Sequence, residues 1–279
     1  MNFTTGAAQY LLRYAEQTVP CNQSSLSRLG LDRSRCLLKV NEYALLCVPY
    51  QFGFKRSIFL ASLSKQEILF FQSFLHKAVG LSMEFSLPNR QDPLKLFIRS
   101  SLEAVGQLKG RENVGLFVVD YKNTPEDYVV ILGNYLEYQD RLKAQFEDYG
   151  KTELRMNPEL ARAMGFNMYA TCTGSSKVQP HGENGASVQA DPGAERRIQV
   201  FTLSSRSLEH LEAANAPERL PGSLAAFQLY FQKYRVSVTG RVQSASRLAT
   251  GLWRVRSNLD FSPELVEILD DYYLKEPKQ

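Results

Sequence analysis

The sequence is poor in the residues that carry most metal and nucleophilic chemistry. Its 279 residues include four cysteines (Cys21, Cys36, Cys47 and Cys172) and three scattered histidines. No C-x-x-C spacing and no histidine pair is present, whereas zinc sites and disulfide frameworks normally show such regular spacings. We therefore expect no metal, no cofactor and reduced thiols, as in a cytoplasmic protein.

The motifs of common enzyme classes are also absent. The chain contains no G-x-x-x-x-G-K-[ST], no G-x-G-x-x-G after a predicted strand and no G-x-S-x-G. The carboxylates of Glu264, Glu267, Asp270 and Asp271 fall on the predicted exposed side of a helix, where solvated acidic groups are commoner than catalytic pairs. The sequence favours a binding protein over an enzyme.

Long apolar runs are missing as well. Residues 1–16 lack the basic stretch and unbroken apolar core of a secretory signal, and no run approaches the about 20 residues of a membrane span. A hydrophobic content of 44% and a charged content of 22% are ordinary for a soluble globular protein. The formal charge of +4 is too small to indicate a nucleic-acid partner by itself.

The strongest positive signal is an internal repeat. Gly115 to Tyr121 is an apolar strand followed by a Thr-Pro-Glu helix start, and Gly251 to Phe261 is an alternating segment followed by a Ser-Pro-Glu helix start. Upstream of each copy lies another predicted strand with an internal glycine, Gly106 in the first and Gly240 in the second. A repeat of this length predicts two domains of one kind.

Shorter patterns predict the other elements. A capping box of Ser64 and Glu67 opens a helix that we expect to end at Gly80. We expect Cys21 to Ser27 to form a loop and Leu224 to Tyr234 to form a short helix. Many short strands, with a single helix after each set, favour an α+β, mainly β fold of two small antiparallel barrels, each followed by an amphipathic helix.

We expect the following domain organisation. Residues 1–30 form an N-terminal helical segment, 31–172 the first domain with flanking helices, and 196–279 the second domain. Residues 173–195 are rich in Gly, Ser, Asn and Pro with almost nothing to bury, which is typical of a flexible linker.

Arginines on the predicted strands are the candidate binding groups. If the valines between Arg235 and Arg241 face the core, these two arginines face outward, as do Arg254 and Arg256 on the next strand. Guanidinium groups bind phosphate bidentately and stack on purines, so such a face suits an anionic nucleotide. The alternative, which the residues alone favour, is that the arginines keep an outer strand face soluble.

The repeat resembles the second half of a PilZ domain, the bacterial cyclic di-GMP receptor barrel. The resemblance covers Leu81 to Leu142 and Arg235 to Tyr273, where a barrel strand, a G-L-x-x-V-like strand and an acidic amphipathic helix follow one another. It implies tandem PilZ-like domains, the first similar to the atypical domain that often precedes a PilZ module. Each would be a six-stranded antiparallel barrel with a terminal helix.

The ligand motif of that family has an Arg-x-x-x-Arg segment and an Asp/Asn-x-Ser-x-x-Gly segment. The chain offers the adjacent pair Arg196 and Arg197 for the first segment. For the second it offers residues 202–207, which keep Ser204 and contain Arg206, and residues 32–37, which keep Asp32 and Ser34 and contain Arg35. The resemblance therefore implies a ligand site of Arg196, Arg197, Ser204 and Arg206, with Arg35 as a contributor from the first domain.

Two functions follow as hypotheses. The first is a PilZ-type regulatory protein in bacterial signalling or motility that binds cyclic di-GMP. The second is a ligand-free PilZ-like adaptor that binds a protein partner through exposed sheet edges. A small barrel that binds RNA or DNA is a third reading and is not expected, because no face shows interleaved aromatic and basic residues.

Overall fold

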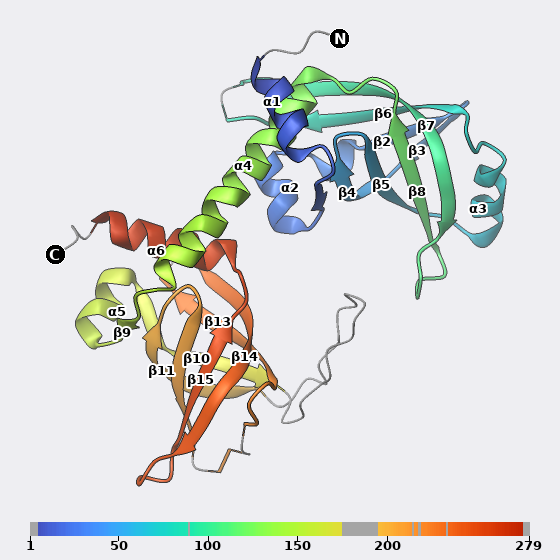
Figure 1. The fold of residues 1–279 in the computed structure, drawn as a ribbon. Coiled ribbons are helices and arrows are strands. Elements are labelled where there is room, and N and C mark those ends of the chain that lie inside the picture. Colours follow the sequence, from blue (N-terminus) through green and yellow to red (C-terminus); the bar gives the residue numbers. More distant parts are fainter. Residues whose placement is uncertain are drawn as a thin grey trace. The chain divides into compact units, whose positions relative to one another are not determined.

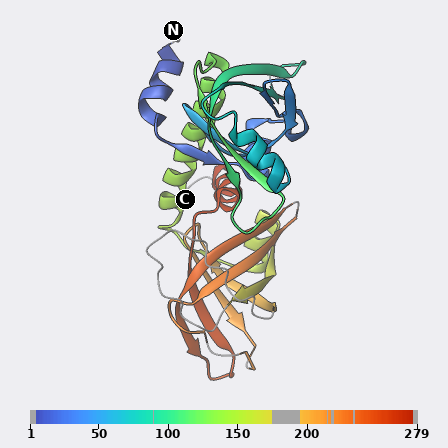
Figure 2. The ribbon, with the colours of Figure 1, turned by 90° about the vertical axis from the view of Figure 1, so that its right-hand side faces the viewer.

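The computed structural model describes residues 5–88, 90–174, 195–213, 215–216, 219–232 and 234–275. The chain divides into two compact units, residues 1–138 and 139–279, and each has its own hydrophobic core. In both units, strands curl around the core and a helix follows the last strand (Figures 1 and 2). The fold is mainly β with two antiparallel sheets, as expected from the sequence.

The sheet of the first unit has the strand order β1-β4-β5-β8-β7-β6-β2-β3. Its strands are β1 (Thr18–Pro20), β2 (Leu37–Val40), β3 (Tyr43–Leu46), β4 (Val48–Gly53), β5 (Arg56–Ser62), β6 (Ala78–Phe85), β7 (Leu94–Gln107) and β8 (Val114–Tyr121). β3 and β4 are separated by the single residue Cys47, whose N–H donates to the Cys36 carbonyl over 3.0 Å. At Cys47 the chain therefore passes from β3, at one end of the strand order, to β4, the second strand from the other end.

Helices cover the first unit at its ends. They are α1 (Thr5–Tyr14), α2 (Gln23–Leu29), the 3-10 turn η1 (Arg33–Arg35), α3 (Lys65–Gln72) and α4 (Glu126–Tyr149), which continues into the second unit. The predicted capping box of α3 is present, because Ser64 Oγ accepts from the Glu67 N–H and the Glu67 carboxylate accepts from the Ser64 N–H. None of the helices in the described part of the chain combines the length and apolar character needed to cross a bilayer.

The second unit is a closed barrel. Its elements are β9 (Leu154–Arg155), α5 (Pro158–Met164), β10 (Phe166–Gly174), β11 (Arg196–Leu203), β12 (Ser207–Glu212), β13 (Leu224–Phe231), β14 (Arg235–Arg247), β15 (Trp253–Leu259) and α6 (Pro263–Lys275). Six strands pair in the order β10-β13-β14-β15-β12-β11, and pairing of β11 with β10 closes the circle. The short strand β9 pairs with the last two residues of β11, whereas β10 pairs with the first four residues of β11.

The predicted repeat is visible as two strand-to-helix units. β7 and β8 followed by α4 correspond to β14 and β15 followed by α6. In the second copy Leu265 and Leu269 of α6 are fully buried, as their helical spacing predicts.

The division of the chain differs from the expected one. We expected residues up to 172 in the first domain, but β9, α5 and β10 all belong to the second unit. The physical reason is non-local pairing, because β10 is a partner of both β11 and β13. Residues 175–194, most of the expected linker, lie outside the described residues; the segment connects two strands of one barrel.

Three local expectations were wrong. Residues 23–29 are the helix α2 and not a loop, because Asn22 and Ser25 form a capping box and Gly30 ends the helix in the left-handed region. Residues 224–231 are the strand β13 and not a helix, since buried and half-buried side chains alternate strictly. α3 ends at Gln72 and not at Gly80, because β6 begins at Ala78 with the same period of two.

Candidate functional site

Polar side chains close one end of the second barrel. Alternation along the strands turns Arg196 of β11 and Glu212 of β12 to the inner face, beside the buried aliphatic residues of each strand. Cys172 of β10 lies directly opposite Arg196 in the ladder. Arg219, from the segment between β12 and β13, is also buried, so four polar groups meet where a barrel normally holds apolar side chains.

The Glu212 carboxylate is the centre of this group. Arg219 Nε donates to its Oε1 over 3.1 Å, and Arg196 Nη1 donates to its Oε2 over 3.4 Å. His210 Nε2 lies 3.1 Å from the same Oε1. Two guanidinium groups thus compensate one buried carboxylate, which is the condition under which a buried charge is tolerated.

Burial sets the protonation states of the network. Burial lowers the pKa of His210, against the opposite effect of Glu212, so the imidazole is neutral near pH 7. Burial acts to raise the pKa of Glu212, but the His210 hydrogen bond and the Arg219 charge outweigh it and hold the pKa below its usual value. Burial raises the pKa of the Cys172 thiol to about 12. The network contains one carboxylate and two guanidinium charges.

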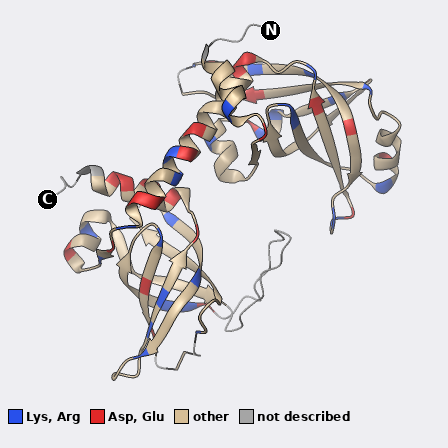
Figure 3. Ribbon diagram, viewed as in Figure 1, with Lys and Arg blue, Asp and Glu red and all other residues tan. Residues whose placement is uncertain are grey.

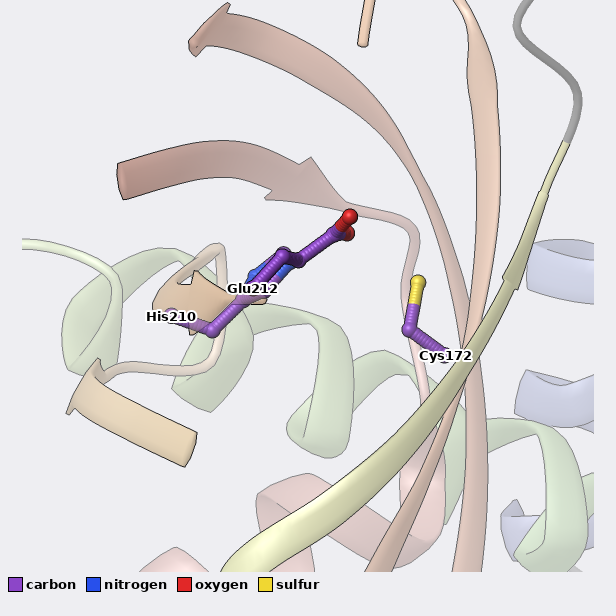
Figure 4. Close-up of side chains that lie close together, drawn as sticks. All are labelled: Cys172, His210 and Glu212. Carbon is purple, nitrogen blue, oxygen red and sulfur yellow. The ribbon is translucent and has the colours of Figure 1, made fainter. Parts of the chain in front are cut away.

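Three of these residues could ligate a metal ion. One ligand atom each from Cys172, His210 and Glu212 lies within 4.8 Å of the others (Figure 4). However, Arg219 donates to Glu212 and its Nη2 also lies 3.7 Å from Cys172 Sγ, so a guanidinium already occupies the space among the ligands. A dication there would leave two arginine charges uncompensated. The group fits an ion network better than a metal centre.

A shallow groove of about 370 Å³ lies on the outside of the same barrel end. It is lined by residues of β10, β11 and β12, among them Tyr169, Arg197 and Glu212. The Arg197 guanidinium carbon lies 4.4 Å from the centre of the Tyr169 ring, a cation–π arrangement. Arg197 makes no ion pair with any residue that the structure describes. Its planar charge is therefore available to a ligand.

The predicted site residues on β11 separate into two groups. Arg196 and Arg197 are adjacent and point to opposite faces, Arg196 to Glu212 and Arg197 to Tyr169. Ser204 is fully buried at the other end of the strand, where its Oγ accepts from the Ser207 N–H over 2.9 Å. Eight residues of extended chain span about 26 Å, so these two ends cannot grip one nucleotide base.

The two remaining candidates are placed elsewhere. Arg206 Nη1 lies 2.5 Å from Glu147 Oε2, and its guanidinium carbon lies 5.9 Å from the Phe146 ring centre. Arg35 is exposed in η1 of the first unit, in a turn where the Asp32 carboxylate accepts from the N–H and the hydroxyl of Ser34. Of the five predicted residues, Arg197 is the one that lines this groove and has no ion-pair partner in the described ranges.

The arginines predicted on the outer strand face are outside, but they do not form a free basic surface. Arg254 and Arg256 of β15 both approach Glu209 of β12, and Arg256 also pairs with Glu153. Arg241 donates to the Gly222 carbonyl over 3.3 Å. Acidic and basic residues therefore occur together on these strands (Figure 3). This outcome favours the solubility interpretation of these four arginines.

Sequence reasoning missed the inner network because its members lie far apart in the chain. Cys172, His210 and Arg219 come from three separate segments, and their meeting depends on strand pairing. A signal was present in β12, where Leu208, His210 and Glu212 share the inward parity. Two polar residues in succession at core positions indicate a buried polar network.

The comparisons with known proteins place the first unit in a family. Residues 6–139 match the family model of the PilZN3 domain. The first unit is a PilZN3 domain, and the chain is a PilZ-like protein. No curated protein sequence matches the chain.

The whole chain, with both of its units, is similar to several solved structures of bacterial proteins, among them the following three. They are PlzA of Borreliella burgdorferi in complex with c-di-GMP (12% identity, 96% of this chain and 98% of that chain, TM-score 0.44), YcgR of Escherichia coli in complex with c-di-GMP (10%, 92% and 91%, TM-score 0.27) and apo MrkH of K. pneumonia (9%, 99% and 96%, TM-score 0.26). The family assignment rests on the PilZN3 model and not on these superpositions.

Proposed function

We propose that this chain is a PilZ-type regulatory binding protein that takes an anionic guanine nucleotide of the cyclic di-GMP kind at the groove of the second barrel. The observation that carries the proposal is Arg197, whose guanidinium lies over the Tyr169 ring in that groove and has no ion-pair partner among the described residues. A flat cation of this kind can stack on a purine and bind a phosphate oxygen. We propose that the protein binds this ligand and does not catalyse a reaction on it. We also propose that it acts in the cytoplasm, where such nucleotides act as signals.

The inner network supports this assignment electrostatically. Arg196, Arg197 and Arg219 contribute three guanidinium charges at this barrel end, and Glu212 is the carboxylate that Arg196 and Arg219 share. The excess is positive, which favours an anion in the groove. Because Arg196 and Arg219 are fixed by Glu212, Arg197 is the cation that can make direct contact.

The test is isothermal titration of the full chain with cyclic di-GMP. We expect measurable binding by the wild type and at least tenfold weaker binding by Arg197→Ala. Arg235→Ala is the matched control, since Arg235 also lies over a tyrosine ring of this barrel, 5.6 Å from the centre of Tyr230, but lines no part of the groove. The absence of heat with the wild type at high micromolar ligand would remove the receptor assignment.

A second candidate function, a ligand-free adaptor for a protein partner, is favoured by an apolar row on the PilZN3 domain. Leu46, Leu37 and Phe97 are 59%, 40% and 60% exposed, and the ladders of β3, β2, β6 and β7 align them with Ser82 in one row. The next row contains Lys39 and Arg99, which make no ion pair with described residues.

Exposed apolar groups beside unpaired cations fit a partner surface that is apolar and acidic. The adaptor reading is tested by affinity capture from cells with wild type, Phe97→Ser and the control Leu69→Ser, whose side chain is 57% exposed on α3. A partner lost with Phe97→Ser and kept with Leu69→Ser, together with silent nucleotide titration, would establish the adaptor. Equal capture of the partner by both variants would show that the apolar row is not the surface that binds the partner.

A further inference from the structure

The PilZN3 domain contains a larger groove of about 580 Å³ that is independent of the second barrel. Three elements form it: α2, the connection between β6 and β7, and α4. Its walls are aliphatic, with Leu29 and Leu87 on one side and Val130 and Ile131 on the other. Its polar lining includes two arginines and two tyrosines, so the groove combines apolar walls with positive charge.

One stripe of α4 provides the floor. Val130, Ile131, Asn134, Tyr135 and Tyr138 line the groove, and their spacing of one, three, one and three residues keeps them on one helix face. Leu132 and Leu136 are buried and belong to the core. Val130, Ile131 and Tyr135 are partly buried against the same core, so the groove runs along the border between the core-facing and exposed sides of α4.

The opposite wall is fixed by close backbone contact. Gly30 ends α2 with φ of +70°, and a Cβ at this position would lie 2.2 Å from the Ser86 carbonyl oxygen. The Ser86 N–H donates to the Gly30 carbonyl over 2.7 Å. This contact holds the end of α2, with Arg28 and Leu29, against the end of β6, which leads to Leu87 and Arg90. The groove is preformed by the fold.

Two guanidinium groups from different elements reach this groove. Arg28 Nη1 donates to Tyr138 Oη over 2.9 Å, and its guanidinium carbon lies 5.4 Å from the Tyr138 ring centre. Arg28 is thus held on an aromatic ring. Arg90, from the connection after β6, is exposed and makes no ion pair with any residue in the described part of the chain.

We propose that this groove is a second ligand site, which takes a small anion with a flat aromatic body, of the size of a mononucleotide. The volume is in the range of about 300–1,000 Å³ found for small-molecule sites. Arg90 and Arg28 supply the cations for a phosphate or carboxylate, and the tyrosines and aliphatic walls hold the aromatic ring. The site lies entirely within the PilZN3 domain and does not depend on the Arg197 groove.

The test uses guanosine monophosphate as the probe, titrated into the full chain by calorimetry. We expect binding of guanosine monophosphate, with guanosine and inorganic phosphate each binding at least tenfold more weakly, because each retains half of the recognised chemistry. Arg90→Ala is expected to weaken binding at least tenfold, and Ile131→Trp, which fills the groove, to abolish it. Arg99→Ala is the control, because Arg99 is an exposed arginine of the same domain that lies outside the groove.

Each contrary result overturns the proposal in a distinct way. The absence of binding at millimolar guanosine monophosphate removes the site. Binding that Arg197→Ala destroys and Arg90→Ala leaves intact places the nucleotide on the second barrel instead. Tighter binding of decanoate than of guanosine monophosphate replaces the aromatic ligand by an aliphatic one. Thermal unfolding of each variant confirms that the groove mutants are folded before they are compared.

Discussion

Arg219 Nε donates a hydrogen bond to Glu212 Oε1 over 3.1 Å, and both side chains are almost completely buried. Arg219 also donates from Nη1 to the Gly174 carbonyl over 3.0 Å, at the last residue of β10. One residue of a connecting segment thereby links the ends of β10 and β12, which are not neighbours in the chain. The Arg219–Glu212 pair therefore holds these two strand ends together. Glu212 also lines the groove that contains Arg197.

Replacement of Arg219 by alanine should be among the most destabilising changes in the second barrel. The variant leaves the Glu212 carboxylate buried with the neutral His210 ring and, as its one remaining cation among the described residues, the more distant Arg196. Loss of one partner of a buried ion pair costs about 3–5 kcal/mol. We expect that loss in the free energy of unfolding from urea titration. Arg206→Ala breaks the exposed pair with Glu147 and should cost no more than about 1 kcal/mol. Equal effects of the two variants would contradict the network.

The second prediction concerns pH. The pKa of His210 is lowered in the folded chain by burial, so below the unfolded value of about 6.5 the unfolded chain binds a proton that the folded chain does not. The contribution of the neutral His210 to the free energy of unfolding is fully present above about pH 6.5. It is lost as the pH falls from there toward the folded pKa. The slope is at most about 1.4 kcal/mol per pH unit. Glu212, whose folded pKa is also lowered, adds a loss below about pH 4.5.

Urea midpoints measured between pH 7.5 and 5 check this prediction. Glu212, Arg219 and Glu209 face His210 and influence it, but burial dominates. The His210→Gln variant lacks the titrating ring, so its stability should vary less over the same interval. A wild-type stability that rises as the pH falls from 7 to 5.5 would show that the imidazole is protonated in the fold.

The parts of this fold that the sequence predicts are those set by neighbours in the chain. The Pro-Glu starts of α4 and α6, the capping box at Ser64 and the alternation of β6 are local patterns, and the sequence alone predicts each of them. The site was less predictable. Arg197 was identified, but its ring partner Tyr169 depends on the β10–β11 ladder, which joins residues on either side of a segment more than twenty residues long.

The third prediction concerns Cys47, the residue between β3 and β4, and its neighbour Cys36. The sulfur atoms of Cys36 and Cys47 lie 3.6 Å apart and both residues are fully buried. The hydrogen bond with Cys47, together with burial, raises the pKa of Cys36, so its reactive thiolate is scarce. Iodoacetamide at pH 8 should label this pair at least 100-fold more slowly in the folded chain than in urea. Labelling of the pair in the folded chain at the unfolded rate would show that the chain opens at these two cysteines.

The fourth prediction uses the two glycines of the internal repeat. A Cβ at Gly240 of β14 would lie 2.3 Å from the Asn258 carbonyl oxygen of β15, whereas a Cβ at Gly106 of β7 would meet nothing within 4 Å. Neither glycine has a positive φ, so the difference between the two sites is one of space. Gly240→Ala must force β14 and β15 apart and should cost about 1–3 kcal/mol.

Gly106→Ala, in the equivalent strand of the first copy, is the control. Gly106 lies opposite Leu116 near the start of β8, whereas Gly240 lies opposite Leu259 at the end of β15. The substitution removes freedom from the unfolded chain without a clash, and should be neutral or stabilise by about 0.4–1 kcal/mol. The measurement is the urea midpoint of each variant, with far-ultraviolet circular dichroism to confirm the fold. Because the second barrel is closed and each strand is held on both sides, β15 has little room to move away from β14. Equal tolerance of alanine at both glycines would mean that β14 and β15 can separate at Gly240 without loss of stability.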